Sequence, residues 1–384
     1  MNILLVMDGF DPGGAQRVVI DLARMAIKDP DVNVFIAVSK AHGVLSGSVP
    51  EGVTVFEFGR YRELLDAVSF TKKMVDFCEL YSIDIIVSHM MPINKAIARA
   101  KILDNRLPPV IGVEHTEVGR QFARPRLRRR RFLRLRWKWF TRRIETKFLY
   151  KKLDKIVIVA GTLADGLLNH FSVEPSKIVM IHNPVDINRA ESPGTVWEHF
   201  SSSIGKTVIS IGRFDQVKNF HLLIEAFSQV SKMRGSNCDK LLLIGDGPRR
   251  QQLANYAHDL GVSDQVVFCG FQEDVFSYLK ESDVFVSTSH FEGLGNAMLE
   301  AIAFGCPCIA TRTAGSEEIA KYVDGIAIVE QGDLEGLSKK IYEQLENPII
   351  CISSRDREFV NGLSPDKVWR QYKAVISQAL GICI

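Results

Sequence analysis

Short apolar runs alternate along the chain with stretches in which apolar residues recur at helical spacing. Such runs predict buried strands, and the stretches between them suit helices of about ten to fifteen residues. The predicted strands form two series, residues 3–7, 32–39, 53–58, 83–88, 110–113, 155–159 and 178–181, then 207–211, 241–244, 266–268, 284–287, 307–310 and 326–329. Strand–helix alternation predicts parallel sheets covered on both faces. These strands are too many for one sheet, so we expect two doubly wound α/β domains.

The region between the two series is the best candidate for a linker. Residues 183–206 contain two prolines and a run of three serines, and they show no clear periodicity. We therefore predict a first domain over residues 1–187 and a second over residues 188–365. Residues 366–384 are predicted as one amphipathic helix, because their apolar residues recur on a single helical face.

Length and composition agree with this division. A chain of 384 residues suits two domains, and its 46 % hydrophobic and 24 % charged residues exclude disordered, collagen-like and coiled-coil proteins. No apolar run reaches the roughly 18 residues of a membrane span, and the N-terminus lacks the basic region of a signal peptide. The seven cysteines are scattered without a CxxC pair. They favour a reduced, cytoplasmic compartment over a disulfide framework or a zinc site.

One segment, here called the basic belt, departs from this composition. Residues 120–152 hold 15 Lys and Arg and one acidic residue, so the belt carries +14 while the rest of the chain carries −11. Apolar residues recur there at helical spacing, namely Leu133, Trp137, Phe140, Ile144 and Phe148. This pattern predicts a basic amphipathic helix that binds an anionic lipid surface. The residues assigned to a membrane or acceptor surface are Arg128, Arg129, Arg130, Arg131, Arg134, Trp137 and Lys138.

Two other interpretations of the basic belt stay open. Its apolar stripe packs on its own domain while the arginines are merely solvated, or the belt binds nucleic acid. No aromatic stacking sheet or recognised nucleic-acid motif accompanies it, so we expect no nucleic-acid partner.

Candidate chemistry follows the predicted strands, because ligands of parallel α/β sheets bind beyond the carboxyl ends of the strands. Gly13 and Gly14 precede the first helix, where the backbone can approach an anion, although their spacing is not a dinucleotide fingerprint. Arg213 directly follows the strand at 207–211, and Lys218 comes five residues later. A guanidinium fork and an ammonium point charge suit a diphosphate. The alternative is an ordinary turn with solvated charges.

Further candidates lie after other strands. Glu292 falls in a glycine-rich loop, and Glu300 falls eight residues later in the next helix, where a carboxylate can accept hydrogen bonds from a vicinal diol. Gly245 follows another strand, and His115 follows the strand at 110–113. Taken singly, a tight turn at Gly245 and a structural role for His115 are the favoured explanations. The segment 29–31 matches the D-x-D pattern of metal–nucleotide enzymes, but its place between a helix and a strand predicts a turn.

Together these motifs resemble the retaining glycosyltransferases of family 4. The resemblance is carried by Gly212-Arg213-x4-Lys218-Asn219, Gly245-Asp246-Gly247-Pro248, Glu292-x7-Glu300 and Phe304-Gly305-x-Pro307, and more loosely by Gly13-Gly14-Ala15 and His115. It implies the GT-B fold, in which two Rossmann-like domains face each other across a cleft and a C-terminal helix crosses back to the N-terminal domain.

The resemblance also implies roles. Arg213 and Lys218 would hold the donor diphosphate, Glu300 the ribose hydroxyls and Glu292 the transferred sugar. Gly14 would offer its amide to the distal phosphate, Gly270 and Phe271 would border the nucleobase, and His115 would line the acceptor side. The expected catalytic residues are His115, Arg213, Lys218 and Glu292, and the expected donor-binding residues are Gly14, Arg213, Lys218, Gly245, Gly270, Phe271, Glu292, Asn296, Ala297, Met298 and Glu300.

The implied activity is transfer of a sugar, with retention of configuration, from a nucleotide-sugar to a lipid-linked saccharide. UDP is the expected nucleotide. Arg213, Lys218 and helix amides can stabilise the leaving diphosphate, so no metal or other cofactor is expected. The basic belt would attach the enzyme to the inner face of the plasma membrane. The alternatives are an epimerase or phosphorylase on the same scaffold, or a non-catalytic basic protein that binds membranes or nucleic acid.

Overall fold

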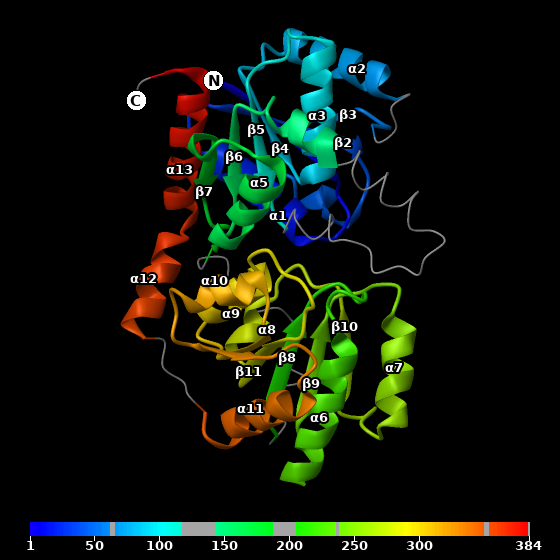
Figure 1. Ribbon diagram of the computed structural model, residues 1–384. Coiled ribbons are helices and arrows are strands. Elements are labelled where there is room, and N and C mark those ends of the chain that lie inside the picture. Colours follow the sequence, from blue (N-terminus) through cyan, green and yellow to red (C-terminus); the bar gives the residue numbers. More distant parts are fainter. Residues whose placement is uncertain (62–65, 117–142, 187–204, 236–237, 349–352, 383–384) are drawn as a thin grey trace, which may run out of the picture. The chain divides into compact units, whose positions relative to one another are not determined.

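The computed structural model describes residues 1–61, 66–116, 143–186, 205–235, 238–348 and 353–382. The chain divides into two compact units (Figure 1). The first unit comprises residues 1–184 together with residues 365–384, and the second comprises residues 185–364. This division lies close to the predicted boundary, and the C-terminal helix belongs to the first unit.

The first unit is built on a parallel sheet of seven strands in the order β3-β2-β1-β4-β5-β6-β7. The strands are β1 (Asn2–Gly9), β2 (Asn33–Lys40), β3 (Thr54–Glu57), β4 (Ile85–His89), β5 (Val110–Glu114), β6 (Lys155–Ile158) and β7 (Ile178–Met180). The helices are α1 (Gly14–Ala26), α2 (Ala67–Leu80), α3 (Met91–Leu103), α5 (Ala164–Phe171) and α13 (Pro365–Leu380), with short 3-10 turns at Val44–Ser48, Gly161–Leu163 and Pro175–Lys177. Residues 143–150 are also helical. The strand order reverses between β1 and β4.

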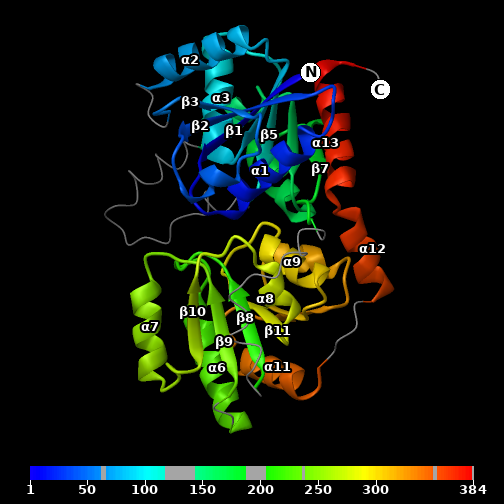
Figure 2. The same ribbon diagram turned by 180° about the vertical axis from the view of Figure 1, so that it is seen from behind.

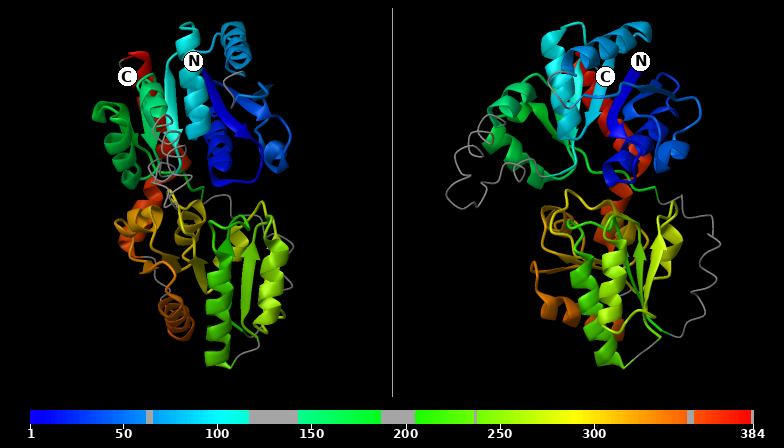
Figure 3. Two further views of the ribbon diagram at one scale, coloured as in Figure 1. Left: turned by 45° about the vertical axis from the view of Figure 1, so that its right-hand side comes forward. Right: turned by 90° about the vertical axis from the view of Figure 1, so that its right-hand side faces the viewer.

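The second unit repeats this plan with six parallel strands in the order β10-β9-β8-β11-β12-β13. The strands are β8 (Thr207–Ile211), β9 (Lys240–Ile244), β10 (Val266–Gly270), β11 (Val284–Ser287), β12 (Cys308–Thr311) and β13 (Ile326–Val329). The helices are α6 (Phe220–Arg234), α7 (Arg250–Asp259), α8 (Phe276–Lys280), α9 (Asn296–Ala303), α10 (Ala314–Ala320), α11 (Leu334–Glu346) and α12 (Ser354–Gly362). Figure 3 shows helices on both faces of this sheet. Its strand order reverses between β8 and β11.

Burial explains why the strands appear in the sequence as apolar runs. Every residue of β4 and β5 is buried, and the core of the second unit takes Val208, Leu241 and Val284 from three neighbouring strands. Strands covered on both faces have no solvent side, so they lack alternating polar positions. Each predicted strand is confirmed, with its ends shifted by at most two residues.

The C-terminal helix α13 packs on α1 of the first unit (Figures 1 and 2). Its inner face buries Val368, Trp369 and Tyr372. The Trp369 Nε1 and the Lys373 Nζ donate to one carboxylate oxygen of Asp29, at 3.2 Å and 2.7 Å. These partners hold the pKa of Asp29 below its usual value. The segment 29–31 is therefore a turn, as predicted, and its first carboxylate anchors α13.

The basic belt is only partly described. Residues 117–142 lie outside the described residues, and with them Arg128, Arg129, Arg130, Arg131, Arg134, Trp137 and Lys138. In the described remainder, residues 143–150 bury Leu149 and Tyr150 on one face and expose Ile144 and Phe148, at 52 % and 54 %, on another. Among the helices that the structure describes, none combines the length and apolar character needed to cross a bilayer.

Candidate functional site

The predicted donor residues of the second unit gather where its strand order reverses. Arg213 follows β8, and the loop with Glu292 follows β11, and β8 and β11 are neighbours in the sheet. The crevice beyond the carboxyl ends of strands at such a reversal is the usual ligand site of open α/β sheets. The topology therefore brings together two loops that are far apart in the sequence.

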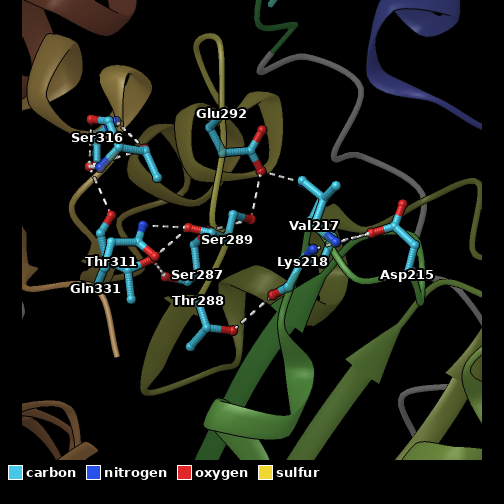
Figure 4. Close-up of polar contacts among 11 residues, drawn as sticks. Asp215, Val217, Lys218, Ser287, Thr288, Ser289, Glu292, Thr311, Ser316 and Gln331 are labelled. Carbon is cyan, nitrogen blue, oxygen red and sulfur yellow. Dashed lines mark hydrogen bonds and ion pairs between the residues drawn. The ribbon is translucent and has the colours of Figure 1, made fainter. Parts of the chain in front are cut away.

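The loop after β8 is shaped by Asp215. One of its carboxylate oxygens accepts from the backbone amides of Val217 and Lys218, at 2.8 Å and 3.2 Å. The turn leaves Arg213 exposed and directs the Lys218 side chain toward the loop after β11 (Figure 4). The two cations thus come from one loop, and α6 begins two residues after Lys218.

Glu292 is the partner of Lys218. The Lys218 ammonium forms an ion pair with Glu292 Oε1, and the Ser289 hydroxyl donates to the same oxygen at 2.9 Å (Figure 4). The two ionic side chains are only 26 % and 16 % exposed, so this pair is shielded more than a surface salt bridge. A predicted phosphate-binding cation and a predicted sugar-binding carboxylate therefore neutralise each other in the structure.

A framework of hydroxyl and amide groups holds this pair. The Thr288 hydroxyl bonds the carbonyl of Lys218 at 3.0 Å, while the carbonyl of Ser289 accepts from Thr311 Oγ1 at 2.8 Å and Gln331 Nε2 at 3.0 Å. Sequence analysis did not single out Thr288, Ser289, Thr311 or Gln331. The available signal was Ser289, a hydroxyl just after a strand and three residues before Glu292.

Close backbone packing explains the glycines at this edge. Gly245 has a φ of +131°, and a Cβ there would lie 2.0 Å from the carbonyl oxygen of Gly212, so no side chain fits. The Gly245 amide donates to the carbonyl of Gly270 at 2.7 Å. The ends of β8, β9 and β10 are thus joined through glycine. Phe271, the predicted nucleobase neighbour, is 38 % exposed beside them.

The start of α9 supplies backbone amides. Its N-cap residue is Gly295, with a φ of +78°, and glycine has no side chain with which to cap the first turn. Asn296, Ala297 and Met298 form that first turn, and Glu300 follows on the same helix. A helix N-terminus with backbone donors favours an anion.

The remaining predicted residues, Gly14 and His115, belong to the first unit. Gly14 is exposed and is the first residue of α1. His115 follows β5 and is only 9 % exposed. It contacts a residue that sequence analysis missed, His89, whose Nδ1 lies 3.0 Å from His115 Nε2. A signal was present in the sequence, because His89 directly follows the strand predicted at 83–88, as His115 follows its own strand closely.

A buried polar network lies beside this histidine pair. Asn94 Nδ2 donates to Glu114 Oε1 at 2.7 Å, the Tyr150 hydroxyl donates to the same oxygen, and the Ser88 hydroxyl donates to Asn94 Oδ1 at 2.6 Å. Burial raises the pKa of the Glu114 carboxyl to about 7, against the lowering effect of these two donors. Burial lowers the pKa of His115 to about 4 and that of His89 well below its usual value. Both rings are therefore neutral near pH 7.

Within the residues that the structure describes, no group of three or more His, Cys, Asp or Glu side chains is arranged to hold a metal ion. The positive groups around the second-unit site are side chains and helix amides.

Comparison with known protein families gives a match in each half of the chain. Residues 12–189 match the model "Glycosyltransferase Family 4", and residues 197–359 match "Glycosyl transferases group 1". Together the two models span most of the chain. The chain belongs to these glycosyltransferases. The resemblance inferred from the motifs is confirmed.

Two of the curated relatives of this glycosyltransferase are named for lipopolysaccharide core biosynthesis. The lipopolysaccharide core biosynthesis glycosyltransferase LpsE of Rhizobium meliloti is 42 % identical over 134 residues, which is 35 % of this chain and 38 % of the relative. The UDP-Gal:alpha-D-GlcNAc-diphosphoundecaprenol alpha-1,3-galactosyltransferase of Escherichia coli is 24 % identical over 366 residues, or 91 % of this chain and 90 % of the relative. In four of the curated matches, the aligned part spans only 38 % to 62 % of the relative's length.

Solved structures show that this glycosyltransferase has the predicted GT-B fold. Anabaena HepE, solved in complex with UDP, has a TM-score of 0.77 at 18 % identity, covering 98 % of this chain and all of that one. WaaG, described as a glycosyltransferase of lipopolysaccharide biosynthesis, has a TM-score of 0.73 at 15 % identity, covering 98 % and 99 % of the two chains.

Proposed function

We propose that this glycosyltransferase is a retaining hexosyltransferase that moves a sugar from a UDP-sugar to a lipid-linked saccharide. The observation that carries the proposal is the Lys218–Glu292 pair at the strand-order reversal of the second unit, with Arg213 on the same loop as Lys218. The name of the Escherichia coli relative gives a UDP-sugar donor and a diphosphoundecaprenol acceptor, and HepE was solved with UDP. Both support the same choice for this chain.

Charge development explains the proposed roles. When the bond between the anomeric carbon and phosphate breaks, negative charge grows on the leaving diphosphate. Arg213, Lys218 and the amides at the start of α9 would stabilise that charge. Glu300 would accept hydrogen bonds from the ribose hydroxyls, and Phe271 would border the base. These fixed groups supply the positive charge directly, so we propose a reaction that requires no metal.

Donor binding changes the partner of Lys218. The ammonium bound to Glu292 would turn toward the diphosphate, whose charge is larger than that of one carboxylate. Glu292 would keep the hydrogen bond from Ser289, which holds the carboxylate where the sugar binds. We propose front-face retention, in which the leaving phosphate helps to deprotonate the acceptor hydroxyl and no covalent glycosyl-enzyme forms.

We also propose that the protein works at an anionic membrane, on the cytoplasmic face. The described end of the basic belt supports this, because Ile144 and Phe148 are exposed on a helix whose neighbouring positions Lys147 and Lys151 are also exposed. Apolar side chains flanked by lysines favour the interface of an anionic leaflet. A lipid-linked acceptor would be reached from the same surface.

Thermal unfolding with UDP, GDP and ADP tests the donor site. UDP at about 100 times its dissociation constant should stabilise the wild type by roughly 2.7 kcal/mol. Arg213→Ala/Lys218→Ala should lose that shift, whereas Lys339→Ala, which removes a 72 % exposed lysine on α11, should retain it. No shift with any nucleotide would overturn the proposal, and a shift only with GDP or ADP would replace UDP as the donor nucleotide.

The reaction itself is tested with a UDP-sugar and a polyprenyl-diphosphate saccharide. We expect UDP release that depends on the acceptor, continues in EDTA and gives a product with the donor's anomeric configuration by NMR. An isomerised UDP-sugar without an acceptor would indicate an epimerase instead. Dependence on inorganic phosphate would indicate a phosphorylase.

A further inference from the structure

The histidine pair of the first unit lies where its strand order reverses. His89 is the last residue of β4, beside the reversal, and His115 directly follows the neighbouring strand β5. The two ring centroids are 5.3 Å apart, and the ring planes are within 21° of each other. Since His89 Nδ1 and His115 Nε2 are 3.0 Å apart, one ring donates a hydrogen bond to the other. Each neutral imidazole carries a proton on only one of its two nitrogens. One of the two facing nitrogens is therefore the N–H donor, and the other is the acceptor.

The second nitrogen of His89 indicates which ring donates. His89 is fully buried, and its Nε2 has no hydrogen-bond partner among the described residues. If His115 were the donor, the neutral His89 would carry its proton on Nε2, as a buried N–H without an acceptor. Unpaired buried N–H groups are rarer in proteins than unpaired acceptors. The favoured arrangement therefore has His89 Nδ1–H donating to His115 Nε2.

Neighbouring groups do not impose another tautomer. Glu114 precedes His115 in sequence, but its Oε1 is occupied by Asn94 and Tyr150. Successive residues of a strand point to opposite faces, so this carboxylate lies on the other side of the backbone from the His115 ring. Among the residues that the structure describes, the contact with His89 is thus the hydrogen bond to His115 that can select its tautomer.

We propose that His89 is a positioning residue that fixes His115 as the Nδ1–H tautomer. His115 Nε2 is then occupied by His89, and Nδ1 carries a proton. A ligand that reaches His115 therefore meets a neutral hydrogen-bond donor, which fits a hydroxyl, ring or carbonyl oxygen. His115 cannot accept a proton at either nitrogen while this contact holds, so it is not a general base. The saccharide as the oxygen-bearing ligand rests on the proposed function, whereas the tautomer does not.

Histidine-labelled full-length protein allows a direct test by long-range ¹H–¹⁵N NMR at about pH 7. His115 should show a protonated Nδ1 and a bare Nε2, and His89 should show the same pattern. The signals that disappear in His115→Gln belong to the His115 ring, and those that disappear in His89→Asn belong to the His89 ring. A wild-type His115 protonated at Nε2 would overturn the proposal without any variant.

Two substitutions of His89 test the positioning role. His89→Asn keeps an N–H near the place of Nδ1, and we expect it to retain the His115 tautomer. His89→Leu removes the donor, and we expect mixed tautomers at His115 and a fall of about tenfold in kcat/KM for the glycosyl transfer. An unchanged His115 spectrum in His89→Leu contradicts the proposal. Should His89→Leu not fold, the wild-type and His89→Asn spectra still decide the question.

The UDP titration separates this inference from the proposed function. If His115 is the Nδ1–H tautomer but no nucleotide binds, the positioning role of His89 is retained and the proposed glycosyl transfer is rejected. If a nucleotide binds but His115 is protonated at Nε2, the positioning role is rejected and the proposed function is retained.

Discussion

The Glu114 carboxyl shows how burial and hydrogen bonding compete at a single residue. Its surroundings raise its pKa to about 7, because desolvation raises the pKa by more than the hydrogen bonds from Tyr150 and Asn94 lower it. A carboxyl whose pKa is higher in the folded state than in the unfolded state stabilises the protein at low pH. That contribution is complete below the unfolded value, near 4.5, and is lost as the pH rises through 7.

Glu114→Gln should remove this pH dependence, since the amide resembles the protonated acid. We expect the variant to be more stable than the wild type at pH 8 by on the order of 1–3 kcal/mol, with a smaller difference at pH 5. Urea denaturation of the first unit's transition at both pH values measures this. Glu174→Gln, at an exposed position, is the matched control and should change neither value. A Glu114→Gln effect of equal size at both pH values would contradict the pKa assignment.

The same region has an opposing pH response. The pKa of His115 is lowered to about 4, so its burial stabilises the protein above its ordinary value of 6.5, and that stability falls as the pH drops toward 4. Acid therefore charges the histidines, and base charges Glu114.

Charged residues in the loops after strands were accessible to sequence analysis, whereas residues whose role depends on a contact were not, even where they also follow a strand. Arg213, Lys218 and Glu292 could be chosen because charged groups at strand ends in a known order are rare by chance. Ser289 and His89 are ordinary in sequence, and their significance comes from contacts with Glu292 and His115. The Lys218–Glu292 ion pair was also not predicted, because each residue had been assigned to a different part of the donor.

At the scale of elements, the apolar runs predicted the central strands because these are buried on both faces, and they also predicted the edge strand β3, although it is mostly exposed. The runs did not predict which strands are neighbours. β1 pairs with β4, for example, although β2 and β3 come between these two strands in the sequence. The start of α6 was not predicted correctly either, and it lies at Phe220, after the loop that Asp215 shapes.

The helix at residues 143–150 carries a prediction about membranes. Ile144→Ser/Phe148→Ser should lower partitioning to anionic vesicles by about tenfold or more, because burial of each apolar side chain contributes roughly 1.5–3 kcal/mol when complete. Binding by the wild type should also weaken with salt, since lysines contribute about 1 kcal/mol each near such a surface. Vesicle co-sedimentation measures both effects.

A matched control comes from α2. Val68→Ser changes a 70 % exposed apolar residue outside the basic belt and should leave vesicle binding unchanged. Equal vesicle binding by the wild type and the Ile144/Phe148 variant would show that this helix does not attach the protein to the membrane. UDP binding should persist in all three proteins.

At the scale of the molecule, the first unit is discontinuous in sequence. Residues 1–184 are completed by residues 365–384, because α13 packs on α1 and is held to Asp29 by Trp369 and Lys373. The second unit is continuous. The stability of the first unit therefore depends on residues 365–384, whereas the second unit contains none of them.

Truncation after Ser364 should separate them. We expect the first unit's unfolding transition to fall sharply or disappear, because its surface against α13 becomes exposed, while the second unit still unfolds cooperatively and binds UDP. Calorimetry with and without UDP distinguishes the transitions. Truncation after Leu380, which keeps α13, is the control. Equal loss of both transitions in the shorter chain would show that the units do not unfold independently.

The order of synthesis on the ribosome gives this connectivity a further consequence. The residues of the second unit are all translated before α13, which is the last helix of the first unit to be made. The first unit has its sheet early but must wait for the last helix, and its surface for α13 stays uncovered during translation of the entire second unit. A chain released after residue 364 would carry the whole second unit attached to a first unit without α13, whose uncovered apolar surface a chaperone would bind.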